Sequence, residues 1–394
     1  MNVNWTETKK LALEQLAFLG VEIDIFANVE SLGAGKQQIV EIAKASMHAS
    51  KILILDEPTT SLTVPEREKL FSIMRMLKKR GVAMIFISHF MDEVYEMADK
   101  FVALRDGAQV GVGYLKDVPR RQLEEMMVGR EIGGTAFELA PSSSQIALRV
   151  ENLGSHRFEH VSFSIANGEI LGIAGLMGAG RTELVESIFG IRAASGDIYI
   201  DNECVSPVSV AQMKKAGMVY ITEDRRKNGM FAGRSVKENS SAAGLSYFVK
   251  QLVKGMGFSG ERHAVSALTK EMNVATPSID ASVRQLSGGN QQKVLLGRWL
   301  ATKPKICILD EPTKGVDIGA KFEIHKKIVA LAKQGVAVIV VSSDLQELLD
   351  LSHRIKVMRT GHMVGEFSRE NFDPVKIISL AASSVHEQSH KVAS

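Results

Sequence analysis

Apolar positions near the start of the chain follow first the repeat of an amphipathic helix and then that of a buried strand. A helical spacing relates the apolar positions Ile39, Ile42, Ala43 and Met47. The uninterrupted apolar run at 52–55 predicts a buried strand. The next helical pattern, of about 15 residues, places on one face Leu70, Met74 and Leu77. A second β-rich run, AMIFI at 83–87, completes a strand–helix–strand unit.

The same pattern occurs a second time in the chain at a constant offset. The segment LILDEPT at 53–59 returns as ILDEPT at 308–313, so that Asp56 and Asp310 are 254 residues apart. Other pairs at this offset are Gln37 and Gln291, Gly81 and Gly335, Ser88 and Ser342, and Gly107 and Gly361. A constant offset over so many positions indicates two copies of one unit.

The order of the elements indicates a fold class and a division of the chain. Strands that alternate with helices are typical of an α/β protein with substantial parallel pairing in its sheet. The small, polar stretch GGTAFELAPSSSQ at 133–145 is expected to connect the copies. The predicted parts are a first copy at 1–132, a linker at 133–146, a second copy at 147–382 and a polar tail at 383–394.

Composition narrows the class of protein. A chain of 394 residues is too long for one ordinary core, and a net charge of +3 gives no argument for nucleic-acid binding. The start, MNVNWTETKK, lacks the apolar segment of a signal peptide, and no apolar run approaches the length of a membrane span. The cysteines Cys204 and Cys307 suggest no disulfide framework or metal site, which favours a reducing, cytosolic setting.

Three segments of the second copy carry candidate chemistry, and the first is GLMGAGRT at 175–182. An apolar strand, EILGIAG, precedes it and a helical pattern follows, which is the context of a phosphate-binding loop. Glycines let backbone N–H groups point at phosphate oxygens, and Thr182 can place its hydroxyl on Mg²⁺. Arg181 stands where such loops carry a lysine. The alternative is a strand–helix connection whose glycines serve packing.

The second segment is ICILDEPT at 306–313, where a hydrophobic strand ends in two adjacent acids. Such acids are costly at the end of a buried strand unless a cation or catalysis uses them. We expect Asp310 to hold Mg²⁺ and Glu311 to orient and deprotonate an attacking water. The alternative, a pair of exposed loop acids, is weakened by their repetition as Asp56 and Glu57.

The third segment is LSGGNQQK at 286–293. Its serine and glycines open a helix, so that a hydroxyl and free N–H groups lie at the positive helix end, where a terminal phosphate can bind. A plain helix cap is the alternative.

Together these segments resemble the motifs of ATP-binding cassette (ABC) ATPases. LSGGNQQK, followed 24 residues after its leucine by DEPT, resembles their signature and Walker B motifs, and GLMGAGRT their Walker A loop. The resemblance covers nearly the whole chain and implies two tandem P-loop NTPase cassettes of the ABC type, the first incomplete. GLMGAGRTEL, YITEDRR at 220–226 and SSD at 342–344 are similar to the sugar-importer branch. SHFMDEVYEMADKF at 88–101 resembles ATPases of galactofuranose-type and other monosaccharide importers.

The resemblance implies two composite ATP sites, each between the Walker A loop of one cassette and the signature of the other. The first site would combine a Walker A loop of the first copy, the Mg²⁺ ligand Asp56 and the catalytic residues Glu57 and His89 with the second signature. Its nucleotide-binding residues there are Ser287, Gly288, Gly289 and Gln291. Applying the offset to Gly175 gives a position before Met1, so we expect this chain to lack the first Walker A loop.

The second site would use the second copy's own loop with Asp310 and the catalytic Glu311. Its expected nucleotide-binding residues are Gly175, Gly178, Ala179, Gly180, Arg181, Thr182 and Glu223, with Gly33 and Gly35 from the first signature; its Mg²⁺ ligands are Thr182 and Asp310. Four residues depart from the family pattern: Arg181, Glu223 at the Q-loop glutamine, Ser343 at the switch histidine and Gly33 at the signature serine. Such losses reduce rate more than binding, so we expect Mg·ATP to bind and to be hydrolysed slowly or not at all.

The resemblance also implies partners. We expect an ATPase coupled to monosaccharide import through a separate transmembrane permease, with a periplasmic sugar-binding protein acting indirectly, at the cytoplasmic face of the cell membrane. A groove near the Q-loop would receive a permease helix, and SVKEN at 235–239 lies in that region. An intact cassette could act in trans. The alternatives are a non-enzymatic remnant or regulatory nucleotide binder, and a tandem-cassette ATPase acting on ribosomes or DNA.

Overall fold

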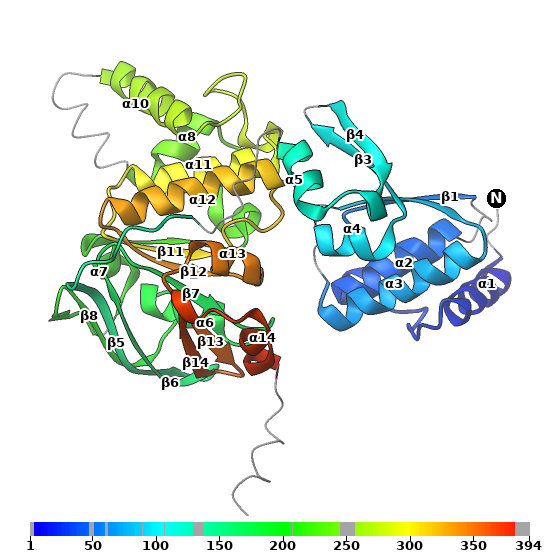
Figure 1. Cartoon of the computed structure of the whole chain (residues 1–394), viewed down its shortest axis with the longest axis horizontal. Coiled ribbons are helices and arrows are strands. Elements are labelled where there is room, and N and C mark those ends of the chain that lie inside the picture. Colours follow the sequence, from blue (N-terminus) through cyan, green and yellow to red (C-terminus); the bar gives the residue numbers. More distant parts are fainter. Residues whose placement is uncertain are drawn as a thin grey trace, which may run out of the picture. The chain divides into compact units, whose positions relative to one another are not determined.

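A computed structural model shows two compact units, Met1–Ile132 and Gly133–Ser394 (Figure 1). The structure describes residues 4–46, 51–59, 62–88, 90–105, 107–128, 137–206, 208–244 and 257–382. His89 and the predicted tail at 383–394 lie outside these residues. Of the helices that the described ranges contain, none has the length and hydropathy that crossing a bilayer requires.

The first unit contains the predicted helix–strand–helix–strand succession. Its helices are α1 (Trp5–Phe18), η1 (Val29–Ser31), α2 (Ala34–Ser46), α3 (Val64–Lys79), α4 (Met91–Met97), η2 (Leu115–Asp117) and α5 (Arg120–Val128). Its strands are β1 (Ile52–Asp56), β2 (Ala83–Ile87), β3 (Lys100–Arg105) and β4 (Ala108–Tyr114). β1 and β2 pair in parallel and β3 and β4 in antiparallel orientation. A capping box between Thr63 and Glu66 begins α3.

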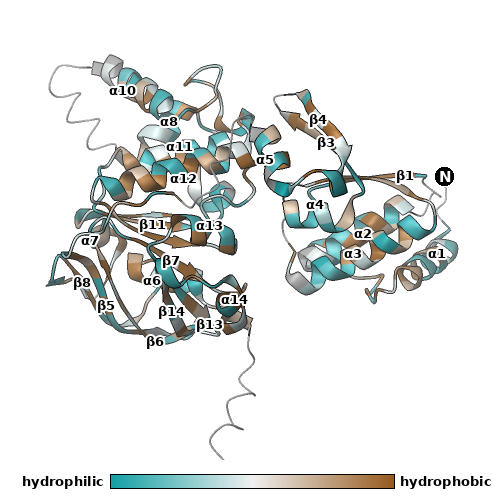
Figure 2. Cartoon of the chain, in the orientation of Figure 1, coloured by the Kyte–Doolittle hydropathy of each residue, from teal (hydrophilic) through white to brown (hydrophobic). Residues whose placement is uncertain are grey.

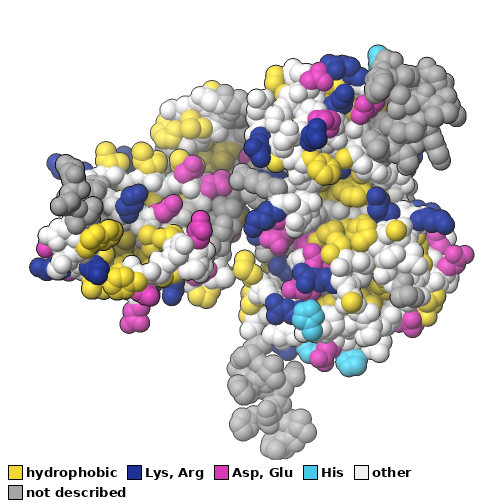
Figure 3. Space-filling model, turned by 180° about the vertical axis from the view of Figure 1, so that it is seen from behind, with side chains coloured by type: hydrophobic (Ala, Val, Ile, Leu, Met, Phe, Trp, Pro, Cys, Tyr) yellow, Lys and Arg dark blue, Asp and Glu magenta, His cyan; other side chains and the backbone are white. Residues whose placement is uncertain are grey.

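One face of the β1–β2 pair is packed and the other is open. Leu53 and Leu55 are buried in a core that includes Leu70, Phe71 and Met74 of α3. The side chains that alternate with them are exposed: Ile52, Ile54, Ile85 and Ile87. Figure 2 shows these strands coloured as hydrophobic, and Figure 3 shows apolar side chains at the surface of this unit. The described residues of the first unit therefore include an apolar sheet face that is exposed.

The second unit has a larger set of elements. Its helices are α6 (Arg181–Phe189), α7 (Val210–Lys215), η3 (Arg225–Gly229), α8 (Val236–Ser241), η4 (Ala242–Gly244), α10 (Gly257–Glu271), η6 (Val283–Gln285), α11 (Gly288–Leu300), α12 (Ile318–Lys333), α13 (Leu345–Leu351), η7 (Arg369–Asn371) and α14 (Pro374–Ala382). Its strands are β5 (Ile146–Ser155), β6 (Phe158–Ala166), β7 (Ile170–Ala174), β8 (Ser195–Ile200), β9 (Glu203–Cys204), β10 (Met218–Ile221), β11 (Ile306–Asp310), β12 (Ala337–Val341), β13 (Arg354–Arg359) and β14 (His362–Ser368).

A six-stranded sheet forms the centre of the second unit, in the order β10-β11-β12-β7-β13-β14. All its pairs are parallel except β13–β14, which confirms the predicted α/β class. Every residue of β7, β11 and β12 is buried, because α6 with its neighbours and α11–α13 cover opposite faces. The second sheet, β6-β5-β8-β9, is antiparallel. The carboxyl ends of β7, β10, β11 and β12 therefore meet at one edge, where the predicted site lies.

Two residues of the segment expected to link the copies, Phe137 and Ala140, contact the rest of the second unit. The Phe137 ring lies 5.5 Å from the Phe322 ring and 6.0 Å from the His325 ring, centroid to centroid. The Ala140 carbonyl lies 2.8 Å from Nε2 of His353.

Candidate functional site

The loop between β7 and α6 is a glycine turn between a strand and a helix, as the sequence predicts for a phosphate-binding loop. Gly178 and Gly180 have φ values of 81° and 95°, which side chains disfavour. A Cβ on Gly175 would lie 2.4 Å from the carbonyl oxygen of Met358. Ala179 is buried, and its N–H donates to the Leu176 carbonyl. The glycines thus hold the tight turn that connects β7 to the start of α6.

Asp310 lies at the end of β11, beside this loop. Its Oδ2 accepts a hydrogen bond of 3.1 Å from the Tyr220 hydroxyl, and Thr182 donates a second hydrogen bond to the carboxylate. Its Oδ1 is buried and has no hydrogen-bond partner among the described residues. Burial raises the pKa of Asp310 to about 7, although the Thr182 and Tyr220 hydrogen bonds oppose the shift.

These residues fit a Mg²⁺ ion carried by a nucleotide. Mg²⁺ in such sites takes one or two protein oxygens and completes its shell with phosphate and water. Asp310 offers an unpaired oxygen and Thr182 a hydroxyl in contact with it. Within the described ranges, no group of three or more His, Cys, Asp or Glu side chains could hold a metal by itself. Asp310 and Thr182 therefore suit a metal ion that is bound together with phosphates.

Replacing Asp310 by asparagine is expected to stabilise the second unit at neutral pH. Because the folded-state pKa lies above the ordinary value of 3.8, stability falls as pH rises from about 4 to 7. Asparagine removes this cost, which should raise the free energy of unfolding at pH 7.5 by on the order of 1–3 kcal/mol. Urea unfolding of wild type and Asp310→Asn at pH 5 and 7.5 measures the difference.

The matched control is Asp56→Asn at the corresponding, exposed position of the first unit, which should leave the second unit unchanged. An Asp310→Asn variant that gains no stability over wild type at pH 7.5 would contradict the assigned cause.

Arg181 turns toward the carboxylate expected to act as the base. Its guanidinium is buried and donates to the Ser342 carbonyl, while Nη2 lies 3.4 Å from Oε1 of Glu311. The second oxygen of Glu311, Oε2, accepts a 3.0 Å hydrogen bond from Ser343. Burial raises the pKa of Glu311, and the charge of Arg181 opposes that shift. Both oxygens of this carboxylate are therefore engaged by residues that depart from the family pattern.

Glu223 follows β10 at the same edge and is exposed. Its Oε1 forms an ion pair of 2.7 Å with Nζ of Lys314, in the turn after Glu311. The charge of Glu223 is also one of the smaller factors that raise the pKa of Asp310, after burial. Glu223 thus acts electrostatically on the carboxylate that is predicted to bind Mg²⁺.

The signature residues form the start of α11. Ser287 is the N-cap, and its Oγ accepts a 2.9 Å hydrogen bond from the Asn290 side chain. Gly289 is buried. The Gln291 amide donates to the carbonyls of Val283 and Leu286, as Gln37 does to Val29 and Leu32 in the first unit. In this conformation the amide of Gln291 holds the turn that precedes the helix.

The first unit places its candidate residues on a half-covered strand. Asp56 ends β1, and both acids are exposed. Glu57 and Glu311 have positive φ values of 45° and 50°, which are uncommon outside glycine and cluster at functional sites. Gly33 precedes α2 and Gly35 lies in its first turn, packed so closely on Glu66 that a Cβ would clash at 2.5 Å. The two acids therefore share the backbone geometry of Asp310 and Glu311 without their burial.

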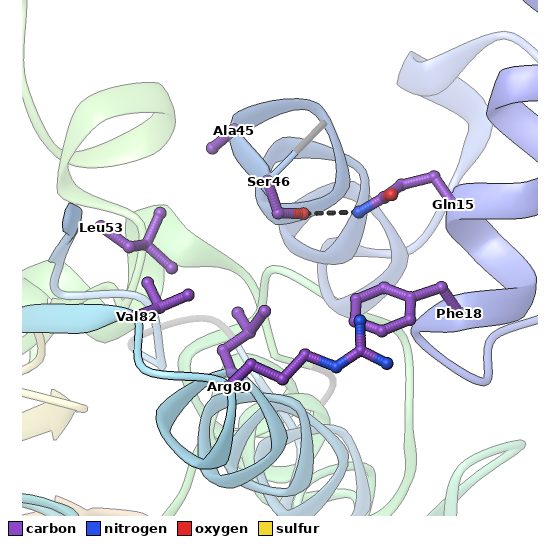
Figure 4. Close-up of a pocket in the computed structure, with 8 residues that line it drawn as sticks. Gln15, Phe18, Ala45, Ser46, Leu53, Arg80 and Val82 are labelled. Carbon is purple, nitrogen blue, oxygen red and sulfur yellow. Dashed lines mark hydrogen bonds between the residues drawn. The ribbon is translucent and has the colours of Figure 1, made fainter. Parts of the chain in front are cut away.

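A pocket in the first unit lies away from these acids, toward the other end of β1. Figure 4 shows Gln15 hydrogen-bonded to Ser46 and the Arg80 guanidinium against the Phe18 ring. Ala45 stands where the second copy has Trp299. A small residue in place of an indole explains the open space.

The sequence analysis did not predict the hydrogen bonds of two residues of the second unit, Tyr220 and Arg298. Tyr220 is a hydroxyl-bearing residue in the otherwise aliphatic strand MVYI, which could have indicated a polar partner. Arg298 is a buried cation on α11 without an acidic partner in the described part of the chain, and its hydrogen bonds go to Gly229 and Asn239. A charged residue at an apolar helix position could have marked it.

Comparison with known proteins identifies the family. A family model described as "ABC transporter" matches residues 5–60 and 158–314. This chain belongs to the ABC transporter family. It is 40% identical over 382 residues to the ribose import ATP-binding protein RbsA of Caldanaerobacter subterraneus, covering 96% of this chain and 77% of the relative. It is 41% identical over 384 residues to a putative ribose/galactose/methyl galactoside import ATP-binding protein of Ralstonia nicotianae, covering 96% and 74%.

Solved structures agree on the fold of this ABC-type ATPase. A nucleotide-free ATP-binding cassette of an ABC transporter matches with a TM-score of 0.51 and 23% identity, covering 61% of this chain and all of the other. A dimeric post-hydrolysis cassette bound to ADP and phosphate matches with a TM-score of 0.50 and 20% identity, covering 57% of this chain and all of the other. The family binds ATP, and ATP hydrolysis is the expected activity.

Proposed function

We propose that this chain is the ATP-binding subunit of a monosaccharide ABC importer. The sequence likeness to sugar-import ATP-binding proteins, over 96% of the chain, carries the proposal. The chain would act at the cytoplasmic face of the cell membrane, with a transmembrane permease as direct partner and a periplasmic sugar-binding protein as indirect partner. An intact cassette in trans is a further candidate partner, because the apolar face of β1 and β2 is exposed.

We propose further that the second unit binds Mg·ATP and hydrolyses it poorly. The phosphate loop and Thr182 hold phosphates and metal, and Asp310 supplies the carboxylate oxygen that Mg²⁺ needs. Bound Mg²⁺ would neutralise phosphate charge. A general base must lie within hydrogen-bond reach of the water whose proton it takes, and donors bound to its oxygens make it a weaker base. Both oxygens of Glu311 are instead engaged by Arg181 and Ser343, and this arrangement supports binding without efficient turnover.

The expected result for the purified chain is nucleotide binding with turnover near background. Steady-state ATPase and binding of a fluorescent ATP analogue would be measured for wild type, Glu311→Gln and Glu57→Gln. Because Glu311 is engaged by Arg181 and Ser343, Glu311→Gln should leave both readouts close to those of wild type. Turnover that matches an intact two-cassette relative, or that Glu311→Gln alone abolishes, would overturn the proposal for this site.

A further inference from the structure

The signature of the second unit contacts the side chain of Arg225, a residue of the segment YITEDRR to which the sequence analysis assigned no role. Arg225 lies in η3, two residues after Glu223. Its Nη1 donates to the Lys314 carbonyl and its Nη2 to the Gly315 carbonyl, both at 2.9 Å. These carbonyls belong to the turn that follows Glu311, and the N–H of Lys314 donates to the Glu311 carbonyl. Arg225 therefore holds the turn that follows strand β11 and Glu311.

The same guanidinium touches the signature. A Cβ on Gly288 would lie 2.5 Å from Nη2 of Arg225 and 2.9 Å from the Gly315 carbonyl. Backbone and guanidinium are thus in contact with no room for a methyl group. The corresponding residue of the first signature is Ala34, 254 positions earlier. This contact explains why position 288 carries glycine. The φ angle of Gly288 is not positive, so the backbone conformation alone does not require glycine there.

A continuous set of contacts thus connects the phosphate loop to the signature helix α11. Nη2 of Arg181 lies 3.4 Å from Oε1 of Glu311, and the Glu311 carbonyl accepts a hydrogen bond from the N–H of Lys314. Arg225 holds the backbone of the same Lys314 and contacts Gly288. Phosphate charge at the loop would act on Arg181 and through it on Glu311, because opposite charges at short range attract. Any shift of Lys314 is then transmitted to α11 through Arg225.

We propose that Arg225 is a positioning residue that couples nucleotide binding at the phosphate loop to the placement of the signature Ser287–Gly289 in the same cassette. Arg225 would act through Lys314, Gly315 and Gly288 rather than by contact with the nucleotide. This inference rests on the proposed binding of Mg·ATP by the second unit. It goes beyond that proposal, because it assigns the residue by which an occupied phosphate loop alters the signature.

The chain contains a fluorescent residue, Trp299, that reports on the position of helix α11. Trp299 lies near the end of this helix, and Nζ of Lys214 on α7 lies 5.7 Å from the centre of its ring. A shift of α11 relative to α7 changes that cation–π contact and the indole emission. The other tryptophan, Trp5, is exposed on the first unit, so Trp5→Phe leaves Trp299 as the sole emitter.

The test compares Trp299 emission with nucleotide occupancy in the full chain carrying Trp5→Phe. Mg·ATP is titrated against the parent chain, Arg225→Ala and Lys227→Ala, an exposed cation of the same turn. Occupancy is measured separately with a fluorescent ATP analogue. We expect Arg225→Ala to lose the emission change while its Kd changes by less than about three-fold. Lys227→Ala should behave as the parent chain does.

Each outcome has a distinct meaning. An unchanged Trp299 response in Arg225→Ala at equal occupancy overturns the coupling role and leaves the proposed function intact. An absence of nucleotide binding in the parent chain overturns the proposed function and the coupling with it.

A second measurement tests the contact without nucleotide. Gly288→Ala should lower the Tm of the second unit, and it should lower it less in an Arg225→Ala background. Recovery should be partial, because the Gly315 carbonyl remains 2.9 Å from the added methyl group. Equal losses in the two backgrounds would contradict the contact.

Discussion

Arg298→Ala is expected to lower the free energy of unfolding of the second unit by about 3–5 kcal/mol. The guanidinium is buried in α11 and donates to three acceptors: the Asn239 carbonyl at 2.6 Å, the Gly229 carbonyl at 2.6 Å and the Asn239 side-chain oxygen at 2.7 Å. Truncation leaves these oxygens short of donors and opens a cavity. Since a domain of this kind is stable by only about 5–15 kcal/mol, the loss is a large part of the total.

The effect should concentrate in the segment between η3 and α8. Asn239 is fully buried and its amide binds both the N–H and the carbonyl of Phe231, so Arg298 and Asn239 together hold this loop on α11. Phe231 itself is exposed, and its ring stacks on Arg298 at 5.6 Å. Once Arg298 is removed, amide exchange in residues 229–239 should accelerate more than in β7 or β12.

Urea unfolding followed by Trp299 emission, together with hydrogen exchange, measures both effects. The matched control is Arg262→Ala, an exposed arginine on α10 that pairs with Asp280 and should change stability little. Equal losses for Arg298→Ala and Arg262→Ala would show that the buried hydrogen bonds contribute nothing specific.

His325→Phe is expected to cost about 3 kcal/mol of stability, because it leaves a buried carboxylate without its main partner. Nε2 of His325 lies 2.8 Å from Oε1 of Glu347, and the same oxygen accepts a 2.7 Å hydrogen bond from Thr313. Burial alone would raise the pKa of Glu347, but His325 and the charge of Lys321 lower it to about 2. Phenylalanine is chosen because the first unit has Phe71 at the corresponding position, so the fold accommodates this side chain there. The variant therefore tests the loss of the partner of Glu347 rather than a change in packing.

The pH dependence of this pair has a defined sign. Because the folded-state pKa of Glu347 lies below the ordinary 4.5, its stabilising contribution is complete above that value. The contribution is lost as pH falls toward about 2. Wild type should therefore lose stability between pH 5 and 3 more steeply than a His325→Phe/Glu347→Gln double variant.

The double variant also serves as the control for packing. Glutamine carries no charge to leave unpaired, so His325→Phe/Glu347→Gln should recover most of the stability that His325→Phe loses. Urea unfolding at pH 7.5 and at several lower values measures this. A double variant no more stable than His325→Phe would show that the stability is lost through the altered side-chain volume rather than through the unpaired charge of Glu347.

Local features of the chain were predicted correctly because neighbours in sequence determine them. The spacing of apolar residues gave α2, β1, α3 and β2, and the 254-residue offset located their counterparts α11, β11, α12 and β12. The strand–loop–helix context of GLMGAGRT is present as β7, the glycine turn and α6. The family followed from the same short motifs, and the comparisons confirm it.

The orientation of the site side chains depended on contacts between distant segments. Arg181 and Glu311 are 130 residues apart in sequence, and Tyr220 and Asp310 are 90 apart. The catalytic role of Glu57 and His89 stays a prediction, as does the nucleotide binding assigned to Gly33 and Gly35.

The sequence by itself determined which elements form, that they form twice, and which residues could bind phosphate and metal, because helical period, strand period and glycine turns are local properties. Only the tertiary structure decided which of those side chains contact one another. It directed Arg181 at the carboxylate of Glu311, left one oxygen of Asp310 without a partner among the described residues, and placed Arg225 against Gly288. These outcomes depend on burial and on which strand ends meet at the sheet edge, and neither is encoded in residue spacing.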